Sequence, residues 1–207
     1  TIYQELLGLI PELKNQNLIR FWNCVPDINS GDGDAEVYKR FCSGRLSGFE
    51  NCGFSPSDFP AASALGGHQS ILTIHMLTSR VAGRHRGNPL QVHAFDYPRE
   101  YGRSSPSFAR STEVSIEGRE SLLIVSGTAS IRGHETLHVD DVAAQTHLSI
   151  DNIDVLLRQS EKTMNSLISS RVYIRRDSDL EAIKQIVEER LPTGERVYLQ
   201  ADICRSN

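Results

Sequence analysis

The order of secondary-structure elements repeats within the chain, and this repeat limits the folds that the chain can adopt. In the first half, apolar spacing predicts a helix over 3–16, a strand over 18–25, a helix over 35–45 and a strand over 70–77. In the second half, the same order returns over 150–157, 167–174, 180–191 and 197–204. The segment Ile19-Arg20-Phe21 aligns with Ser170-Arg171-Val172. The repeat predicts an α+β fold of two similar units, with helices packed on one face of mixed β-sheets.

The two copies differ in which additional strands flank them. Two further strands, predicted over 121–126 and 129–131, precede the second copy, and another, predicted over 88–95, follows the first. The second copy ends where the counterpart of that last strand would begin. We therefore expect a first unit over 1–115 that lacks N-terminal strands and a second unit over 116–207 that lacks its last strand. Such a chain would be part of a longer protein, and its bare sheet edges could support self-association.

Composition excludes several classes of partner. The 207 residues carry a net charge of −4, whereas proteins that bind nucleic acid usually have an excess of Lys and Arg. No apolar run approaches the roughly 18 residues that span a bilayer. The four cysteines form no Cys-x-x-Cys pair, which favours buried free thiols in a cytoplasmic protein over a disulfide framework. We expect neither nucleic acid nor membrane as a partner.

The segment 134–138 reads His-Glu-Thr-Leu-His, which matches the H-E-x-x-H motif of zinc proteases. In those proteins both histidines lie on one face of a helix. Here the preceding residues 122–131 are typical of a strand, Gly133 stands directly before the motif, and Val139-Asp140-Asp141 suits a turn and a helix start. The context therefore argues against a zinc site, and we expect no metal.

The connecting segment 95–110 concentrates side chains that bind anions. It contains Tyr97, Tyr101 and three arginines among Pro, Gly and Ser residues. A guanidinium binds a carboxylate through two parallel hydrogen bonds, and a tyrosine offers both a ring face and a hydroxyl. The segment is therefore either a ligand-binding loop or a solvated linker between the two units.

Glu135 follows a Gly-His turn at the end of an apolar strand. A carboxyl group at such a position could be partly removed from water, which would raise its pKa and suit it to act as a general acid near neutral pH. The alternative is an ordinary exposed glutamate.

Several short segments, spread in order over nearly the whole chain, together resemble the chorismatase family. They are 18–23 (Leu-Ile-Arg-Phe-Trp-Asn), Tyr38-x-x-Phe41-x-x-Gly44-Arg45, 60–66 (Pro-Ala-Ala-Ser-Ala-Leu-Gly), Asn88-Pro89-x-Gln91-Val92, Tyr97-Pro98-x-x-Tyr101-Gly102, 106–110 (Pro-Ser-Phe-Ala-Arg), 126–135 (Ser-Gly-Thr-Ala-Ser-Ile-Arg-Gly-His-Glu), Gln145 and Asp202-x-Cys204-Arg205. Members of this family combine two RidA-like (YjgF-like, chorismate mutase-like) units in one chain.

The resemblance implies an enzyme that cleaves chorismate to pyruvate and a hydroxybenzoate or a dihydroxycyclohexadiene carboxylate, without a metal or organic cofactor. It places the acid on Glu135, which would protonate the methylene carbon of the enolpyruvyl ether. Arg110, with Tyr97 and Tyr101, would bind the substrate, and Arg205 is a further candidate for the same role. Thr128 aligns with the small residue at which the family's chemical subtypes differ. The resemblance covers only the later part of a chorismatase.

Two other functions stay open. A RidA-type imine deaminase would carry an arginine in a Pro-x-Arg setting, but 60–62 reads Pro-Ala-Ala and 192–194 reads Pro-Thr-Gly. A non-catalytic binding protein could retain the same scaffold. Release of pyruvate from chorismate separates the enzyme from the binding protein.

Overall fold

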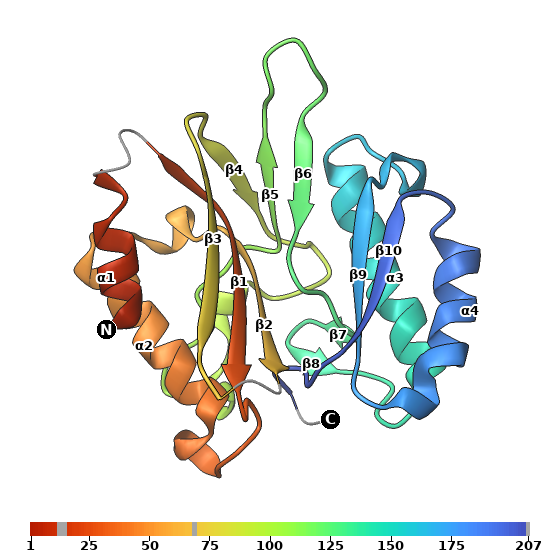
Figure 1. Ribbon diagram of the computed structural model, residues 1–207, viewed down its shortest axis with the longest axis horizontal. Coiled ribbons are helices and arrows are strands. Elements are labelled where there is room, and N and C mark those ends of the chain that lie inside the picture. The colour runs from red at the N-terminus through yellow and green to blue at the C-terminus, as the bar shows by residue number, and fades with distance from the viewer. Residues whose placement is uncertain (12–15, 68–69, 206–207) are drawn as a thin grey trace.

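The computed structural model describes residues 1–11, 16–67 and 70–205, and it contains two helix-covered sheets joined by a third, central sheet (Figure 1). The helices α1 and α2 lie on the outer side of the first sheet, and α3 and α4 lie on the opposite outer side of the molecule. The helices are α1 (Ile2–Gly8), α2 (Val37–Asn51), α3 (Val142–Gln159) and α4 (Leu180–Arg190). The arrangement confirms the predicted α+β class.

The first sheet has the order β2-β1-β3, and its strands are β1 (Asn17–Pro26), β2 (Ala61–Gly67) and β3 (Thr73–Ser79). β1 runs parallel to β2, with Arg20 opposite Ala61, and antiparallel to β3. The rings of Tyr3, Phe21, Phe49 and Phe59 lie between this sheet and its two helices. These four side chains are 0–1% exposed and form the larger of the two cores.

The second helix-covered sheet pairs β9 (Ser169–Ile174) in parallel with β10 (Glu195–Gln200). Its core joins α3 and α4 to the strands through Ile150, Ile174, Ile183 and Val187. In both sheets a helix connects two parallel neighbours, β1-α2-β2 and β9-α4-β10, and a further helix precedes each unit. The predicted repeat is therefore present in the topology. Its first copy, however, closes with β2 rather than with the predicted strand over 70–77, which corresponds to the antiparallel β3.

The central sheet and a small hairpin connect the two helix-covered sheets. The central sheet has the order β4-β5-β6, with β4 (Gly83–Arg86), β5 (Ser111–Val114) and β6 (Leu122–Val125). The hairpin consists of β7 (Ile131–Arg132) and β8 (Glu135–Thr136). The predicted boundary between 115 and 116 falls between β5 and β6, which pair with each other. That boundary stays a prediction.

Several predicted elements differ in extent from the structure. The helix predicted over 3–16 ends at Gly8, and Leu13, which was assigned to its apolar face, lies outside the described residues. The helix predicted over 150–157 begins at Val142, where the Asp141 side chain accepts a hydrogen bond from the Ala144 backbone. The sequence Asp177-Ser178-Asp179 predicts a cap for the helix over 180–191, and Asp179 is indeed the N-cap residue of α4, but it makes no side-chain capping bond and 177–179 form a 3₁₀ turn.

The strand predicted over 88–95 is wrong. This segment makes one isolated bridge, between Gln91 and Gly133, and then enters a 3₁₀ turn, η4 (Ala94–Asp96). Its backbone bonds go to the β7–β8 hairpin, since Val92 N donates to Gly133 O and Gly133 N donates to Leu90 O. The segment therefore fixes the hairpin in place instead of extending a sheet.

Candidate ligand-binding site

The site forms where the 95–110 segment meets the β7–β8 hairpin and the C-terminal residues that the structure describes. The segment contains two short 3₁₀ turns, η4 and η5 (Arg99–Tyr101), with Tyr97 between them. Turns of this kind keep Tyr97 and Tyr101 on one side, and their ring centroids lie 5.2 Å apart. The two tyrosines that the sequence predicted for substrate binding therefore form a pair.

Arg110, immediately before β5, contacts Tyr97 of this pair. Its Nη2 donates to the Tyr97 hydroxyl at 2.6 Å and to Val92 O at 3.3 Å. Its guanidinium carbon is 5.7 Å from the Tyr97 ring centroid and 5.1 Å from that of Phe108. The side chain is buried, with 4% of its surface exposed, and its Nε has no hydrogen-bond partner. A buried guanidinium with an unpaired donor suits an incoming anion.

Arg205 contacts both rings of the tyrosine pair. Its guanidinium carbon is 4.2 Å from the Tyr101 ring centroid and 5.3 Å from that of Tyr97. Its Nη1 donates to His134 O at 2.9 Å and to Thr136 Oγ1 at 3.0 Å, while its buried Nη2 has no partner. Arg205 thus connects the tyrosine pair to the β7–β8 hairpin.

Neither Arg110 nor Arg205 forms an ion pair with any carboxylate of residues 1–11, 16–67 and 70–205. Two guanidinium groups therefore face one tyrosine pair without a counter-ion from the described part of the chain. Such an arrangement favours a ligand with more than one negative charge, because each guanidinium gains most from a charged acceptor.

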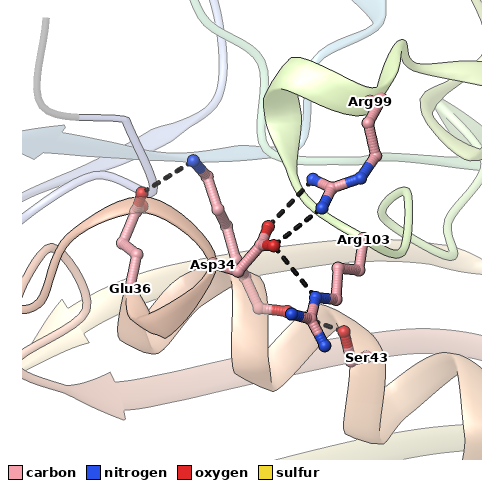
Figure 2. Close-up of polar contacts among 6 residues, drawn as sticks. Asp34, Glu36, Ser43, Arg99 and Arg103 are labelled. Carbon is pink, nitrogen blue, oxygen red and sulfur yellow. Dashed lines mark hydrogen bonds and ion pairs between the residues drawn. The ribbon is translucent and has the colours of Figure 1, made fainter.

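The 95–110 segment is held from outside by Asp34, which lies before α2 (Figure 2). Asp34 accepts two hydrogen bonds from Arg99, at 2.9 and 2.7 Å, and one from Arg103 Nε at 2.9 Å. These bonds, above all those from Arg99, hold the pKa of the Asp34 carboxyl well below its usual range. The two remaining arginines of the segment are therefore structural anchors and are not available to a ligand.

His134 is a part of this site that the sequence reasoning considered only as a metal ligand. Its Nδ1 lies 3.3 Å from the Tyr101 hydroxyl and 3.9 Å from Glu100 Oε1. The H-E-x-x-H motif itself is not helical, since Glu135–Thr136 forms β8. No cluster of three or more His, Cys, Asp or Glu residues within the described ranges could hold a metal ion.

The sequence left two alternatives open for Glu135, partial desolvation or an ordinary exposed glutamate. In the structure Glu135 is exposed. Side chains alternate along a strand, and Thr136 faces Arg205, so Glu135 projects from the opposite face of β8. Its assignment as the acid stays a prediction, and the geometry does not support it.

Thr128 also lies apart from the tyrosine pair. Its hydroxyl donates to Ser126 O at 3.1 Å, and no hydrogen bond connects it to the tyrosine or arginine side chains of the site in the described part of the chain. The Ser126 side chain in turn donates to Ala109 O, immediately before Arg110 in the sequence. Thr128 therefore belongs to the loop that supports Arg110.

The thiols of Cys42 and Cys204 lie together next to the site, a grouping that the sequence reasoning missed. The Tyr38 hydroxyl is hydrogen-bonded to Cys42 and Cys204, and burial raises the pKa of all three groups, that of Cys42 to about 12. Cys204 directly precedes Arg205. The signal was present in the sequence, because Tyr38 and Cys204 both lie in the segments that carry the family resemblance. Both cysteines are free thiols, as expected.

Comparisons with known proteins relate the chain to one family. Residues 1–78 match the family model described as "Chorismatase FkbO/Hyg5-like, N-terminal". The chain is 34% identical to a 3-hydroxybenzoate synthase of Streptomyces hygroscopicus and 34% identical to a chorismatase of Streptomyces rapamycinicus. These alignments cover 99% and 100% of this chain, and 65% and 66% of the relatives. This chain is a chorismatase homologue.

The fold of a solved chorismatase matches that of this homologue. A crystal structure of a chorismatase superposes with a TM-score of 0.92 at 32% identity, over 99% of this chain and 65% of that one. Residues 106–201 match the family model "Endoribonuclease L-PSP", in keeping with the RidA-like unit predicted for the second half. The chain thus spans about two thirds of the length of the chorismatases that it matches. No helix among the described residues is long and apolar enough to cross a membrane.

Proposed function

We propose that this chorismatase homologue is part of an enzyme that cleaves the enolpyruvyl ether of chorismate. The products would be pyruvate and a hydroxybenzoate or a dihydroxycyclohexadiene carboxylate. The observation that carries the proposal is the pair of guanidinium groups of Arg110, which contacts Tyr97, and Arg205, which contacts Tyr97 and Tyr101; neither pairs with a carboxylate of the described residues. Chorismate carries one carboxylate on its ring and one on its enolpyruvyl side chain. Two guanidinium groups beside two tyrosine rings could therefore bind both carboxylates.

The chain's own residues would bind and orient this dianion. The free donors, Nε of Arg110 and Nη2 of Arg205, would each take a carboxylate oxygen. The Tyr97 hydroxyl keeps Arg110 in place and the Tyr101 ring does the same for Arg205. Holding both carboxylates fixes the ether group between them, which lowers the entropic cost of reaching the transition state.

The reaction itself needs a proton and then a nucleophile. Protonation of the enolpyruvyl methylene carbon gives an oxocarbenium ion, which a water molecule or a ring hydroxyl captures. With water, the resulting hemiketal breaks its bond to the ring oxygen and releases pyruvate and the ring diol. We keep Glu135 as the predicted acid and subject it to direct test, since its exposure is unfavourable to that role.

Chorismate binding tests the site independently of turnover. We expect Arg110→Gln and Arg205→Gln each to weaken chorismate binding about tenfold or more, because a charge-assisted hydrogen bond contributes roughly 1.5–3 kcal/mol. Arg158→Gln is the matched control, since Arg158 is an exposed guanidinium on α3. Calorimetric titration measures all three. Equal affinity of the wild type and both site variants would exclude this site.

Pyruvate release, followed with lactate dehydrogenase, tests the chemistry. Glu135→Gln should abolish release if Glu135 is the acid, and undiminished release would remove that role while leaving the binding site intact. A wild-type chain that binds chorismate without releasing pyruvate would favour the non-catalytic binding function. No observation on this chain favours the imine deaminase.

A further inference from the structure

Two arginines at matching positions of the repeat meet at one tryptophan. Arg20 lies on β1 and Arg171 lies on β9, and the sequence repeat aligns them with each other. The guanidinium carbon of Arg20 is 5.2 Å from the Trp22 ring centroid, and that of Arg171 is 5.6 Å from it. The fold therefore brings one cation from each unit to the same indole ring.

Arg20 is buried without an anion. Only 4% of its surface is exposed, and its Nη2 donates to Ser63 Oγ at 2.6 Å, while Nε and Nη1 have no partner. Burial, with repulsion from the nearby Arg45 and Arg171, lowers the pKa of Arg20 to about 9. Neither Arg20 nor Arg171 takes part in an ion pair over the ranges that the structure describes. A buried, unneutralised guanidinium is costly unless an acceptor reaches it.

Contact with aromatic rings does not account for Arg20 as it does for Arg45. The guanidinium of Arg45 lies 5.0–5.3 Å from the centroids of three rings, those of Tyr3, Phe21 and Phe49. These three ring contacts stabilise the cation of Arg45, although its Nε and Nη2 also have no hydrogen-bond partner among the described residues. Among the described residues Arg20 has a ring contact with Trp22 alone, so aromatic contact offsets less of the cost of burying its charge than it does for Arg45.

We propose that Arg20, Arg171, Trp22 and Ser63 form a second binding site, for a small oxyanion such as a carboxylate or a phosphate. Arg20 supplies the buried donors on Nε and Nη1, and the Ser63 hydroxyl fixes the orientation of its guanidinium. Arg171 is exposed and Trp22 is half-buried, so an anion can enter from solvent on the Arg171 side. This site is composed of different residues from the tyrosine pair and does not depend on the function proposed for that pair.

The site contains its own reporter, because Trp22 is the only tryptophan of the chain. Tryptophan fluorescence is followed while inorganic phosphate or benzoate is added at constant ionic strength, with chloride as the balancing salt. We expect a saturable change with at least one of the two, and their relative affinities distinguish a phosphate site from a carboxylate site.

Variants separate this site from general salt effects. Arg171→Gln should weaken binding about tenfold, the loss expected for one charge-assisted hydrogen bond, and Arg20→Met should abolish it. Arg84→Gln, an exposed arginine on β4, is the matched control and should leave the titration unchanged. Circular dichroism checks the fold of each variant. If Arg20→Met does not fold, the affinity of Arg171→Gln for the anion decides whether the second site exists.

Three results would overturn the proposal. They are a wild-type signal that does not saturate with either anion, a signal that chloride alone reproduces, and an unchanged affinity in Arg171→Gln. A response that is lost in Arg205→Gln but kept in Arg171→Gln would assign the anion to the tyrosine pair and equally refute the second site. None of these readouts requires cleavage of chorismate.

Discussion

Replacing Asn152 with alanine should destabilise the chain by about 1–3 kcal/mol. Asn152 is 0% exposed on α3, and its Nδ2 donates to Ala129 O at 3.1 Å and to Ile131 O at 3.0 Å. These bonds attach the loop before β7 and the first residue of β7 to the helix, and hence hold the β7–β8 hairpin of the binding site. The Asn152 backbone oxygen also accepts a bond from Asn88 Nδ2 at 3.0 Å, and this bond survives the change.

The magnitude follows from what the change removes and what it leaves. Two hydrogen bonds of roughly 0.5–1.5 kcal/mol each are lost. Neither carbonyl becomes unpaired, because Ile131 N still donates to Ala129 O and Gln91 Nε2 still donates to Ile131 O. The side-chain oxygen of Asn152 has no partner among the described residues, so its removal relieves part of the cost. The cavity that the amide leaves adds a cost of its own, and the expected total therefore stays near the sum of the two bonds.

Urea denaturation, followed by Trp22 fluorescence and by circular dichroism, measures this free energy of unfolding. Asn51→Ala, which truncates an exposed amide on α2, is the matched control and should change it by less than about 0.5 kcal/mol. Asn152→Asp should cost more than Asn152→Ala at neutral pH, because a carboxylate would face two carbonyl oxygens. A loss below about 0.5 kcal/mol in Asn152→Ala would show that these bonds do not hold the hairpin.

Three further predictions concern the first core, the central sheet and the connecting segment. Phe49→Ala should cost about 3–5 kcal/mol in chemical denaturation, because the ring is 0% exposed, and a loss below about 2 kcal/mol would mean that the core collapses around the gap. Hydrogen bonds from Ser121 and Arg86 lower the pKa of Glu113, so its contribution to stability is complete above its usual pKa and disappears as the pH falls through the lowered value. Glu113→Gln should flatten that acid limb of a pH–melting curve, and an unchanged limb would contradict the assignment. Asp34→Asn should speed tryptic cleavage after the two arginines that Asp34 anchors, and equal cleavage rates would show that other contacts hold the segment.

Elements with strong local patterns were predicted closely. The strand predicted over 18–25 is one residue shorter than β1 at each end, and the helix predicted over 180–191 is one residue longer than α4 at its C-terminal end. β1 is rich in β-branched and aromatic residues, and α4 has apolar residues at helical spacing between a turn and a Pro-Thr-Gly stop. In both cases the local preference of the chain agrees with its place in the fold.

The strand β2 was missed because its residues do not favour strands. The segment 61–67 reads Ala-Ala-Ser-Ala-Leu-Gly-Gly, and its small residues suggested a connection between two elements. In the structure Ala61 and Ala62 are 0% and 4% exposed, and a Cβ at Gly66 would lie 2.5 Å from the Cβ of Asp202. Small residues are required here because other segments approach β2 closely, and only the tertiary structure reveals that approach.

The candidate site likewise has features that the sequence predicted and features that only the tertiary structure revealed. The residue types that bind anions could be recognised in 95–110, but their roles could not, since Arg99 and Arg103 pair with Asp34 whereas Arg110 has no such partner. That difference depends on contacts across about 65 residues of sequence. Whether Glu135 would be buried or exposed likewise depended on which face of a two-residue strand it would occupy, and the pattern of such a short strand does not specify this.

The sequence by itself determined the α+β class, the repeated order of elements, the resemblance to chorismatases and the tyrosines and arginines of the site, because each of these is encoded in local pattern or in motifs. The tertiary structure alone decided which arginines keep free donors, that Glu135 faces solvent, and that Arg20 and Arg171 meet at Trp22. The physical reason is that burial and charge pairing depend on segments that are distant in sequence, and the sequence pattern of one segment carries no information on its partners in space.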